Sequence, residues 1–265
     1  DGEIKLFGNR EETIGTDLPV TAATVASSGE VLAMASTPSY DPNGIANPAS
    51  SEDAWAQVNS NPANPLLNHA TQEQLPPGSI FKIITTAAGL RNGFTPESPL
   101  TGEAQTILPG TDNIPLTNYG GQACAGGGQV PLSTAFALSC NTAFVQMGLA
   151  VGADGLRDAA DRFGVGQSYD LGLPNAAGSL GELPGGAELA QSAIGQRDVT
   201  MTALQAAVMA ATTACARPSD KVLLCAAWPV LSVWPPTSIF VPAGACLIAL
   251  LASVSVCMLS RVIDA

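Results

Sequence analysis

The sequence predicts an α+β fold, because strand-forming segments come first and helix-forming segments follow. Residues 20–26 and 30–35 are β-prone runs on either side of a Ser-Ser-Gly turn, which predicts a β-hairpin. Residues 79–90 contain no proline and are followed by Asn92-Gly93, a common helix stop. The hairpin and this apolar helix are the two best-defined elements of the predicted fold.

The other elements have weaker signals, and each is justified by its local composition. Glycine and proline predict loops, apolar spacing predicts helices, and Thr202 is a suitable N-cap for an alanine-rich helix. In chain order we expect a loop at 44–75 with one short helix near Trp55, a loop at 95–130, helices at 131–150 and 154–163, a strand or helix end at 189–194, and a helix at 203–214.

Composition and charge describe a folded domain and argue against some partners. The chain has 265 residues, of which 46% are hydrophobic, and 22 acidic residues against ten basic ones give a formal net charge of −12. Such a balance argues against nucleic acid, because phosphate binding needs clustered Lys and Arg. None of the six cysteines has C-x-x-C spacing, so no metal is expected.

The most informative motif is Ser79-Ile80-Phe81-Lys82 at the start of a predicted helix. Residues i and i+3 share a helix face, so the Lys82 amine can reach the Ser79 hydroxyl. A serine hydroxyl becomes a good nucleophile when a base takes its proton, and a lysine serves as that base only where burial or a cationic neighbour lowers its pKa. Free N–H groups at the helix start can stabilise an oxyanion. The alternative is a solvated serine with a surface lysine.

Ser139-Cys140-Asn141 is the one S-x-N tripeptide of the sequence. A second hydroxyl can relay a proton between a base and a leaving group, and an amide side chain can bind a substrate peptide bond. A helix cap or a turn would explain the tripeptide equally well. It therefore gains meaning only together with the Ser79 motif.

Four segments in a fixed order resemble the penicillin-binding transpeptidases. They correspond to the opening hairpin, the nucleophile motif, the second motif and the segment before the later strands of that family: residues 29–43, residues 77–82, residues 139–144, and Gly195-Gln196 with residues 202–205. The family commonly has Thr at the position of Ile80. Over about residues 20–214 the chain is identified as a class B penicillin-binding protein transpeptidase, most like the actinobacterial penicillin-binding protein A subfamily.

The resemblance implies a fold and a set of roles. The fold would be that of penicillin-binding transpeptidases and serine β-lactamases, an antiparallel sheet flanked by helices plus an all-helical subdomain. Ser79 would be acylated, Lys82 would be the general base, Ser139 the proton shuttle, and Asn141 would hold the donor peptide. The implied reaction is D,D-transpeptidation of peptidoglycan stem peptides, without cofactor or metal.

The resemblance also implies ligands and a location. β-Lactam antibiotics would bind as mimics of the donor peptide, and cell-division or cell-wall proteins would be further partners. The domain would lie outside the cytoplasmic membrane, anchored by a segment upstream of this chain. From the residues alone, Cys124 and Cys140 could be a disulfide or two separate buried thiols. The extracytoplasmic location favours the disulfide.

The third motif of the family, Lys-Thr-Gly or Lys-Ser-Gly, does not occur in the sequence. The composition also changes after residue 214, because the last 51 residues hold four of the six cysteines but one of the 27 glycines. We therefore divide the chain into a connector from a missing N-terminal region (1–18), an incomplete transpeptidase domain truncated at its C-terminus (19–214) and an apolar tail (215–265). One lost oxyanion donor costs about 10²–10³ in rate, and losing half of the sheet would expose the apolar faces of the helices. We therefore expect this chain to be inactive or poorly folded.

Alternatives remain for the tail and for the function. The tail could be a frameshift or misassembly product, a membrane segment in the 24 uncharged residues 237–260, or a divergent half of the domain. The function could instead be that of a serine β-lactamase, which needs a carboxylate-activated water for deacylation. It could also be that of a β-lactam sensor or a degenerate penicillin-binding domain.

Overall fold

An antiparallel hairpin is the first element of the computed structural model, which describes residues 21–25 and 31–215. Strand β1 (Thr21–Val25) pairs with β2 (Val31–Ser36), with Thr21 opposite Ser36. The pairing becomes irregular between Thr24 and Val25. The predicted hairpin is confirmed, and with the helices that follow it the α+β class is confirmed as well.

The remaining elements follow in chain order. The α-helices are α1 (Pro42–Ala46), α2 (Ser51–Asn59), α3 (His69–Gln72), α4 (Lys82–Arg91), α5 (Leu132–Ala137), α6 (Asn141–Arg162), α7 (Gly186–Ser192) and α8 (Ala203–Cys215). The short strands are β3 (Pro99–Thr101), β4 (Gln105–Ile107), β5 (Pro115–Thr117) and β6 (Gln129–Pro131). The 3₁₀ helices are η1 (Gly78–Phe81), η2 (Tyr119–Gly121) and η3 (Cys124–Gly126).

Two predicted loops contain more regular structure than expected. In residues 95–130, β3 pairs antiparallel with β6 and β4 pairs antiparallel with β5. In residues 44–75, α2 contains Trp55 as predicted, but α1 and α3 flank it. The loop predictions are wrong at these points, because strands of three residues and helices of four or five are too short to show a hydrophobic period.

Helices occur in the regions where the sequence predicts them, but their boundaries differ from the predicted ones. The helix predicted at 131–150 is interrupted at residues 138–140 and becomes α5 and α6. Helix α6 then extends to Arg162 across Gly152, whose φ of 79° interrupts the regular helix shortly before the predicted start at 154. Residues 189–194, left open between strand and helix, fall at the end of α7.

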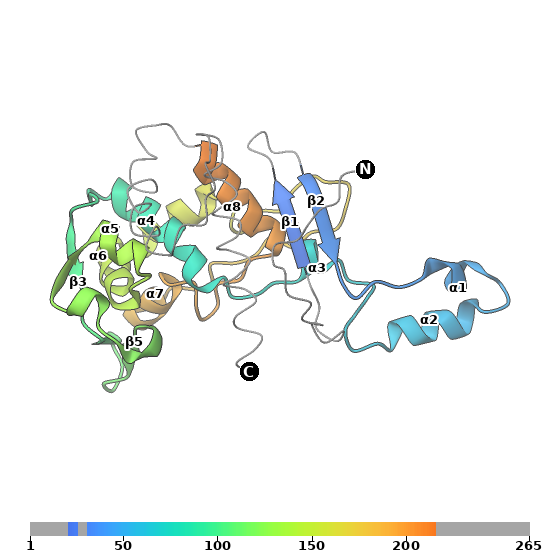
Figure 1. The fold of residues 1–265 in the computed structure, drawn as a ribbon, viewed down its shortest axis with the longest axis horizontal. Coiled ribbons are helices and arrows are strands. Elements are labelled where there is room, and N and C mark those ends of the chain that lie inside the picture. The colour runs from blue at the N-terminus through green and yellow to red at the C-terminus, as the bar shows by residue number, and fades with distance from the viewer. Residues whose placement is uncertain (1–20, 26–30, 216–265) are drawn as a thin grey trace, which may run out of the picture.

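The core lies around α4, which packs against α6, while α6 in turn packs against α7 (Figure 1). Gly89 allows the close approach of α4 to α6, because a Cβ there would stand 2.5 Å from the sulfur of Met147. Side chains without any exposed surface fill this region, among them Phe81, Ile84, Leu132, Phe144 and Met147. The residues of α4 are therefore held by packing on several sides. This helix begins with Lys82, a residue of the candidate site.

Helix α8 contacts the hairpin through β1 (Figure 1). Its start is a capping box, in which the Gln205 N–H donates to Thr202 Oγ1 (3.1 Å) and the Thr202 N–H donates to Gln205 Oε1 (2.9 Å). The prediction that Thr202 caps this helix is confirmed. Among the described residues, the hairpin with α8 against it is the part that corresponds to the predicted sheet flanked by helices.

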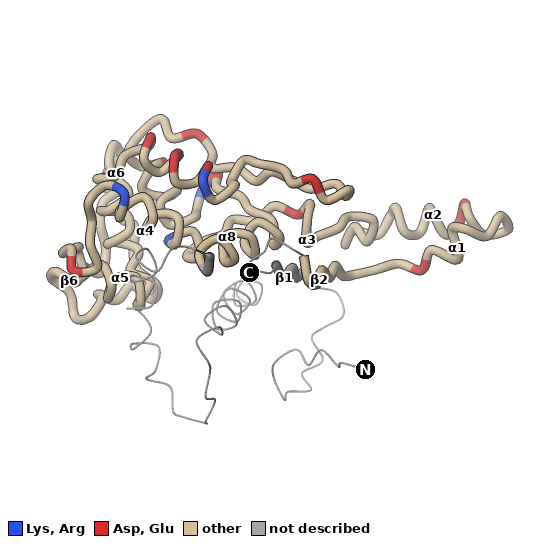
Figure 2. Tube along the Cα trace, turned by 90° about the horizontal axis from the view of Figure 1, so that it is seen from above, with Lys and Arg blue, Asp and Glu red and all other residues tan. Residues whose placement is uncertain are grey.

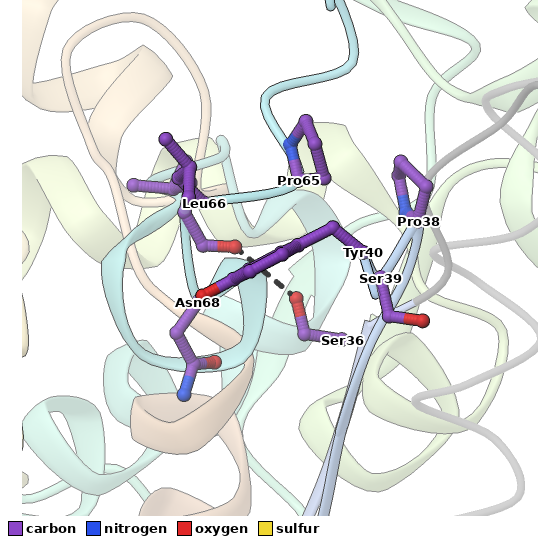
Figure 3. Close-up of a pocket in the computed structure, with 8 residues that line it drawn as sticks. Ser36, Pro38, Ser39, Tyr40, Pro65, Leu66 and Asn68 are labelled. Atoms are coloured by element: carbon purple, nitrogen blue, oxygen red, sulfur yellow. Dashed lines mark hydrogen bonds between the residues drawn. The ribbon is translucent and has the colours of Figure 1, made fainter. Parts of the chain in front are cut away.

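Helices α1 and α2 form an arm, residues 38–66, that extends away from the body of the molecule (Figure 1). Neither helix has a buried residue. The arm carries acidic side chains and no Lys or Arg (Figure 2). Where it joins β2, a shallow pocket of about 220 Å³ lies between Tyr40, Leu66 and Asn68 (Figure 3). Neither Ser79 nor Lys82 lines this pocket.

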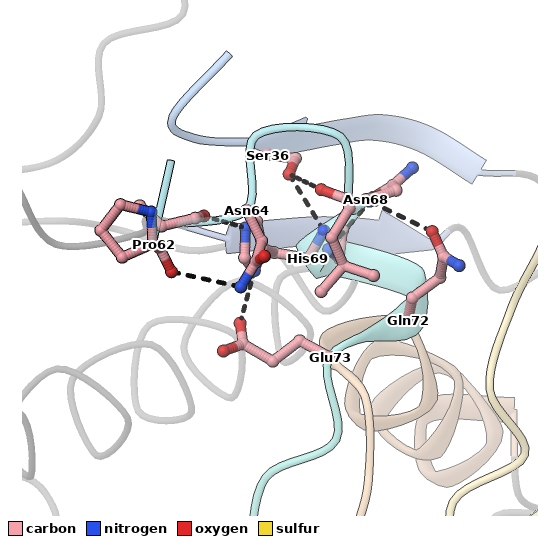
Figure 4. Close-up of polar contacts among 10 residues, drawn as sticks. Ser36, Pro62, Asn64, Asn68, His69, Gln72 and Glu73 are labelled. Carbon is pink, nitrogen blue, oxygen red and sulfur yellow. Dashed lines mark hydrogen bonds and ion pairs between the residues drawn. The ribbon is translucent and has the colours of Figure 1, made fainter. Parts of the chain in front are cut away.

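The base of the arm is held by a polar network around His69 (Figure 4). The imidazole of His69 contacts the Glu73 carboxylate through Nδ1 (3.1 Å) and the Ala63 carbonyl through Nε2 (3.2 Å). Its backbone N–H donates to Ser36 Oγ, and the Ser36 hydroxyl donates to the Leu67 carbonyl. These contacts join the arm to the end of β2.

The predicted connector (1–18) and the predicted tail beyond Cys215, including the candidate span at 237–260, lie outside the described residues. Within the described ranges, no helix combines the length and apolar character needed to cross a bilayer.

Candidate active site

Ser79 lies in the 3₁₀ helix η1, and Lys82 is the first residue of α4. The predicted α-helix therefore starts three residues later than Ser79. In a 3₁₀ turn the side chains at i and i+3 are eclipsed, so Lys82 is brought over Ser79. The Lys82 amine stands 3.4 Å from Ser79 Oγ. The motif spacing thus produces the expected contact, although through a different helix type.

Lys82 is buried, with 2% of its surface exposed. Its amine donates to the Ser139 carbonyl (2.7 Å), to Ser139 Oγ (2.9 Å) and to Asn141 Oδ1 (2.7 Å). The ring of Phe144 lies beneath it, with its centroid 5.4 Å from Nζ. A buried amine needs such acceptors, because an unpaired polar group in the interior costs about 1–3 kcal/mol. The structure places Ser79, Lys82, Ser139 and Asn141 together, and these four residues are called the Ser79 site below.

Ser139 owes its position to the way α5 ends. The Ser139 N–H donates to Phe136 O (3.1 Å), and the Cys140 N–H donates to Ala135 O (2.9 Å). These two bonds form a Schellman motif, in which the residue after the C-cap takes a left-handed conformation. Glycine usually occupies that place, but here Ser139 does so with φ at 56°. A strained non-glycine residue at this point is typical of functional sites.

Asn141 is the first residue of α6, and its amide is oriented by two neighbours. Oδ1 accepts from the Lys82 amine (2.7 Å), and Nδ2 donates to the Thr117 carbonyl (2.9 Å). The opposite orientation would face donor with donor and acceptor with acceptor, so these contacts select one of the two amide flips. The side chain of Asn141 is therefore fixed by a strand of the β4–β5 pair as well as by Lys82.

Cys140, between the two polar residues of the motif, is joined to Cys124 by a disulfide across a Cα–Cα distance of 6.0 Å. Both residues are buried. Cys124 begins η3, and its N–H donates to the Gly102 carbonyl (2.7 Å). The disulfide connects the loop after β5 to the link between α5 and α6.

Gly195 supports the turn that carries Ser79. The Gly78 N–H donates to the Gly195 carbonyl (2.8 Å). A Cβ at Gly195 would stand 2.2 Å from the Gly78 carbonyl oxygen and 2.6 Å from the Phe81 Cβ, and φ at Gly195 is 69°. The glycine of the Gly-Gln segment noted in the sequence is therefore needed for packing, because any side chain here would displace the Ser79 turn.

At Tyr169 and at the Asp158–Arg162 pair, the surroundings change the pKa of a side chain. Burial raises the pKa of the Tyr169 phenol. The hydrogen bond from Arg162, with the charges of Arg162 and Arg91, lowers the pKa of the exposed Asp158 carboxyl and, in return, Asp158 raises the pKa of Arg162. Among residues 21–25 and 31–215, no three His, Cys, Asp or Glu side chains are grouped so that they could hold a metal ion.

Residues 20–216 match the family model of the penicillin binding protein transpeptidase domain. The chain therefore belongs to the penicillin-binding protein transpeptidase family. It is 46% identical over 206 residues to the peptidoglycan D,D-transpeptidase PbpA of Mycolicibacterium smegmatis, and the matched region covers 76% of this chain and 42% of that relative. It is also 46% identical over 202 residues to PbpA of Mycobacterium tuberculosis, with 74% and 41% covered.

A solved structure agrees with these sequence relatives. Penicillin-binding protein A from M. tuberculosis, in a penicillin G acyl-enzyme complex, matches with a TM-score of 0.71 and 44% identity, over 74% of this chain and 46% of that one. The predicted transpeptidase fold and the likeness to the actinobacterial penicillin-binding protein A subfamily are confirmed. The chain spans less than half the length of these relatives.

Sequence reasoning found the four side chains of the Ser79 site but missed their supports. Thr117, Asn118 and Phe144 touch the site or its neighbours, and the sequence analysis gave none of them a role. Phe144 was included in the second segment of the family resemblance without a role. Thr117 and Asn118 precede Asn141 by more than twenty residues in a segment predicted as loop, so no local signal connects them to it.

Proposed function

We propose that this chain carries the serine acyl-transfer site of a D,D-transpeptidase that cross-links peptidoglycan stem peptides and binds penicillin. The observation that carries the proposal is the buried Lys82 amine, which lies 3.4 Å from Ser79 Oγ and 2.9 Å from Ser139 Oγ. One amine can thus exchange protons with two hydroxyls. The D,D-transpeptidase names of the relatives and the penicillin G acyl-enzyme of a related structure support it.

In the first step, Ser79 Oγ attacks the carbonyl carbon of the penultimate D-Ala of a stem peptide. Lys82, as the general base, takes the hydroxyl proton as the C–O bond forms. The tetrahedral intermediate collapses and the C–N bond breaks. Ser139 passes its proton to the departing amine of the terminal D-Ala and receives in turn the proton that Lys82 took from Ser79. The products are an ester on Ser79 and free D-Ala.

In the second step, an amine of a neighbouring stem peptide attacks the ester carbonyl. The attacking nitrogen loses a proton through Ser139 and Lys82, and Ser79 leaves with a proton restored to its oxygen. Asn141 holds the donor peptide in both steps through its amide. A β-lactam follows the first step only, because the nitrogen released by ring opening stays attached to the acyl group and blocks the acceptor.

The absence of the family's third motif bears on the rate of acylation. In the family it supplies a cation for the substrate carboxylate and a second oxyanion donor, and the sequence contains no Lys-Thr-Gly or Lys-Ser-Gly. One missing oxyanion donor costs about 10²–10³ in rate. We therefore propose that the chain as printed is acylated slowly or not at all. Its proposed location is extracytoplasmic, with an upstream membrane anchor and cell-division or cell-wall partners.

The test compares two proteins for labelling by a fluorescent penicillin. One is the chain as printed, and the other joins residues 1–214 to the C-terminal segment of a relative that carries Lys-Thr-Gly. We expect the joined protein to be labelled at Ser79, which mass spectrometry can map, and the printed chain to be labelled at least about 10²-fold more slowly. Ser79→Ala should abolish labelling, whereas the matched control Ser133→Ala, in α5, should keep it.

Each outcome has a consequence. Failure of the joined protein to label, while it remains folded, contradicts the role of Ser79. Equal labelling rates in the two proteins contradict the proposed slow acylation. Rapid release of the label would favour the serine β-lactamase alternative, and stable labelling without any transpeptidation would favour the sensor. The nucleotide sequence around codon 214 would separately decide whether a one-base shift restores the third motif.

A further inference from the structure

Asn118 is the most completely hydrogen-bonded side chain next to the Ser79 site, although it belongs to no recognised motif. It is 5% exposed. Its Oδ1 accepts from the Thr142 N–H (3.0 Å), while the Thr142 hydroxyl lies 2.9 Å from the Glu103 carbonyl and 3.3 Å from Asn118 Oδ1 and can donate to either. Its Nδ2 donates to the carbonyls of Glu103 (2.9 Å) and Gln122 (3.0 Å). Both ends of the amide are therefore used, with Oδ1 as an acceptor and Nδ2 as a double donor.

These bonds join three segments at the start of α6. Thr142 is the second residue of that helix, so its N–H is one of the donors that have no partner within the helix itself. The carbonyls of Glu103 and Gln122 belong to segments on either side of the β4–β5 pair. Asn118 thereby caps α6 from a distant part of the chain and holds it against both segments.

The same residue fixes the partner of Asn141. The peptide unit between Thr117 and Asn118 is planar, with its C=O and N–H directed oppositely. Its N–H donates to the Ala104 carbonyl (3.0 Å), and its C=O accepts from Asn141 Nδ2 (2.9 Å). With the Asn118 side chain bonded to Thr142, this peptide unit has little freedom to rotate. The Thr117 carbonyl is thus held where it selects the orientation of the Asn141 amide.

We propose that Asn118 is a positioning residue for the Ser79 site, fixing the Thr117 carbonyl and through it the direction in which Asn141 presents its amide. The second motif is then held on both sides, at Cys140 by the disulfide to Cys124 and at Thr142 by Asn118. This inference deepens the proposed function and rests on it for the part that concerns acylation. Its structural part can be measured without any acylation.

An aspartate cannot replace Asn118, although it has the same shape. One carboxylate oxygen could still accept from Thr142, but the other would face the Glu103 and Gln122 carbonyls, where the native group is a donor. Asn118→Asp and Asn118→Ala should therefore have the same kind of effect. If the two variants behave alike, their effect comes from loss of the two N–H donors and not from loss of side-chain volume.

The first measurement is NMR spectroscopy of the full chain labelled with ¹⁵N. In both variants, exchange protection of the Thr142 amide should fall by at least about tenfold, because its acceptor is lost or displaced. The side-chain amide signal of Asn141 should shift. The matched control is Asn175→Ala, because Asn175 also bonds backbone groups through both ends of its amide, at Tyr169 and Leu173. That control should leave the Asn141 signal unchanged even where it lowers the melting temperature.

The second measurement is acylation of the joined protein described above. Asn118→Ala should slow acylation by about tenfold to a hundredfold, since displacement of a substrate-positioning group by about 1 Å has effects of that size. In an Asn141→Ala background the same change should add almost nothing. A purely structural role would give additive losses and an unmoved Asn141 signal, and that result overturns the inference.

The two proposals can fail separately. If the joined protein is not acylated, the proposed function fails, while the Asn141 and Thr142 signals still decide the positioning role. If the printed chain shows no protected Thr142 amide in its native sequence, the arrangement does not exist in solution and the inference is overturned.

Discussion

Helix α4, which begins with Lys82, and helix α2 of the arm have similar lengths but opposite surroundings. Seven of the ten residues of α4 are buried, whereas none of the nine residues of α2 is. Helices shorter than about 12–15 residues are marginal when isolated, so α4 owes its stability to packing. The molecule thus places the Ser79 site where tertiary contacts fix the backbone on several sides, and the arm lies outside that network.

The largest expected effect tests the packing beneath Lys82. Phe144 has no exposed surface and lies beneath the Lys82 amine, with its ring centroid 6.2 Å from that of Phe136. Phe144→Ala should lower the free energy of unfolding by about 3–5 kcal/mol, because it removes a large buried ring and leaves a cavity. Urea unfolding would measure it. Phe163→Ala, at a partly buried ring, should cost clearly less, and equal losses would contradict the special place of Phe144.

A smaller effect is expected at Gly195, which tests the contact between the core and the turn that carries Ser79. Gly195→Ala should cost about 1–3 kcal/mol from overpacking against Gly78 and Phe81, added to about 1–2 kcal/mol for a left-handed backbone. Gly93→Ala is the matched control, because Gly93 also has a positive φ but nothing within 4 Å of its Cβ position. Thermal unfolding of both variants would measure the difference. Equal losses of stability would show that the close contact of Gly195 with Gly78 and Phe81 does not contribute to the effect.

The smallest effect is expected in the arm. Trp55 is 49% exposed, so Trp55→Ala should change the free energy of unfolding by no more than about 0.5 kcal/mol. Amide exchange in α2 should also be faster than in α4, because exposed elements open locally at little cost. A loss above about 2 kcal/mol in the Trp55 variant would remove the contrast between the two regions, since it would mean that the arm is packed after all.

Much of the fold and the four chemical groups could be predicted from the sequence because their signals are local. The hairpin follows from two β-prone runs around a glycine-containing turn, and α8 follows from Thr202 with Gln205 three residues later. Ser79 and Lys82 are three residues apart, and both 3₁₀ and α geometry bring such residues to one side. Short elements such as β3 to β6 gave no period and were missed.

A serine, a lysine, a second serine and an amide, in the order of a known family, can be read from the amino-acid sequence alone. How these four side chains meet depends on contacts between distant segments. The left-handed Ser139 depends on the end of α5, the Asn141 orientation depends on Thr117, and the closeness of Gly195 to Gly78 joins residues more than a hundred positions apart. The physical reason is that buried polar groups must find partners, and in a folded chain those partners are set by which distant backbone segments pack side by side.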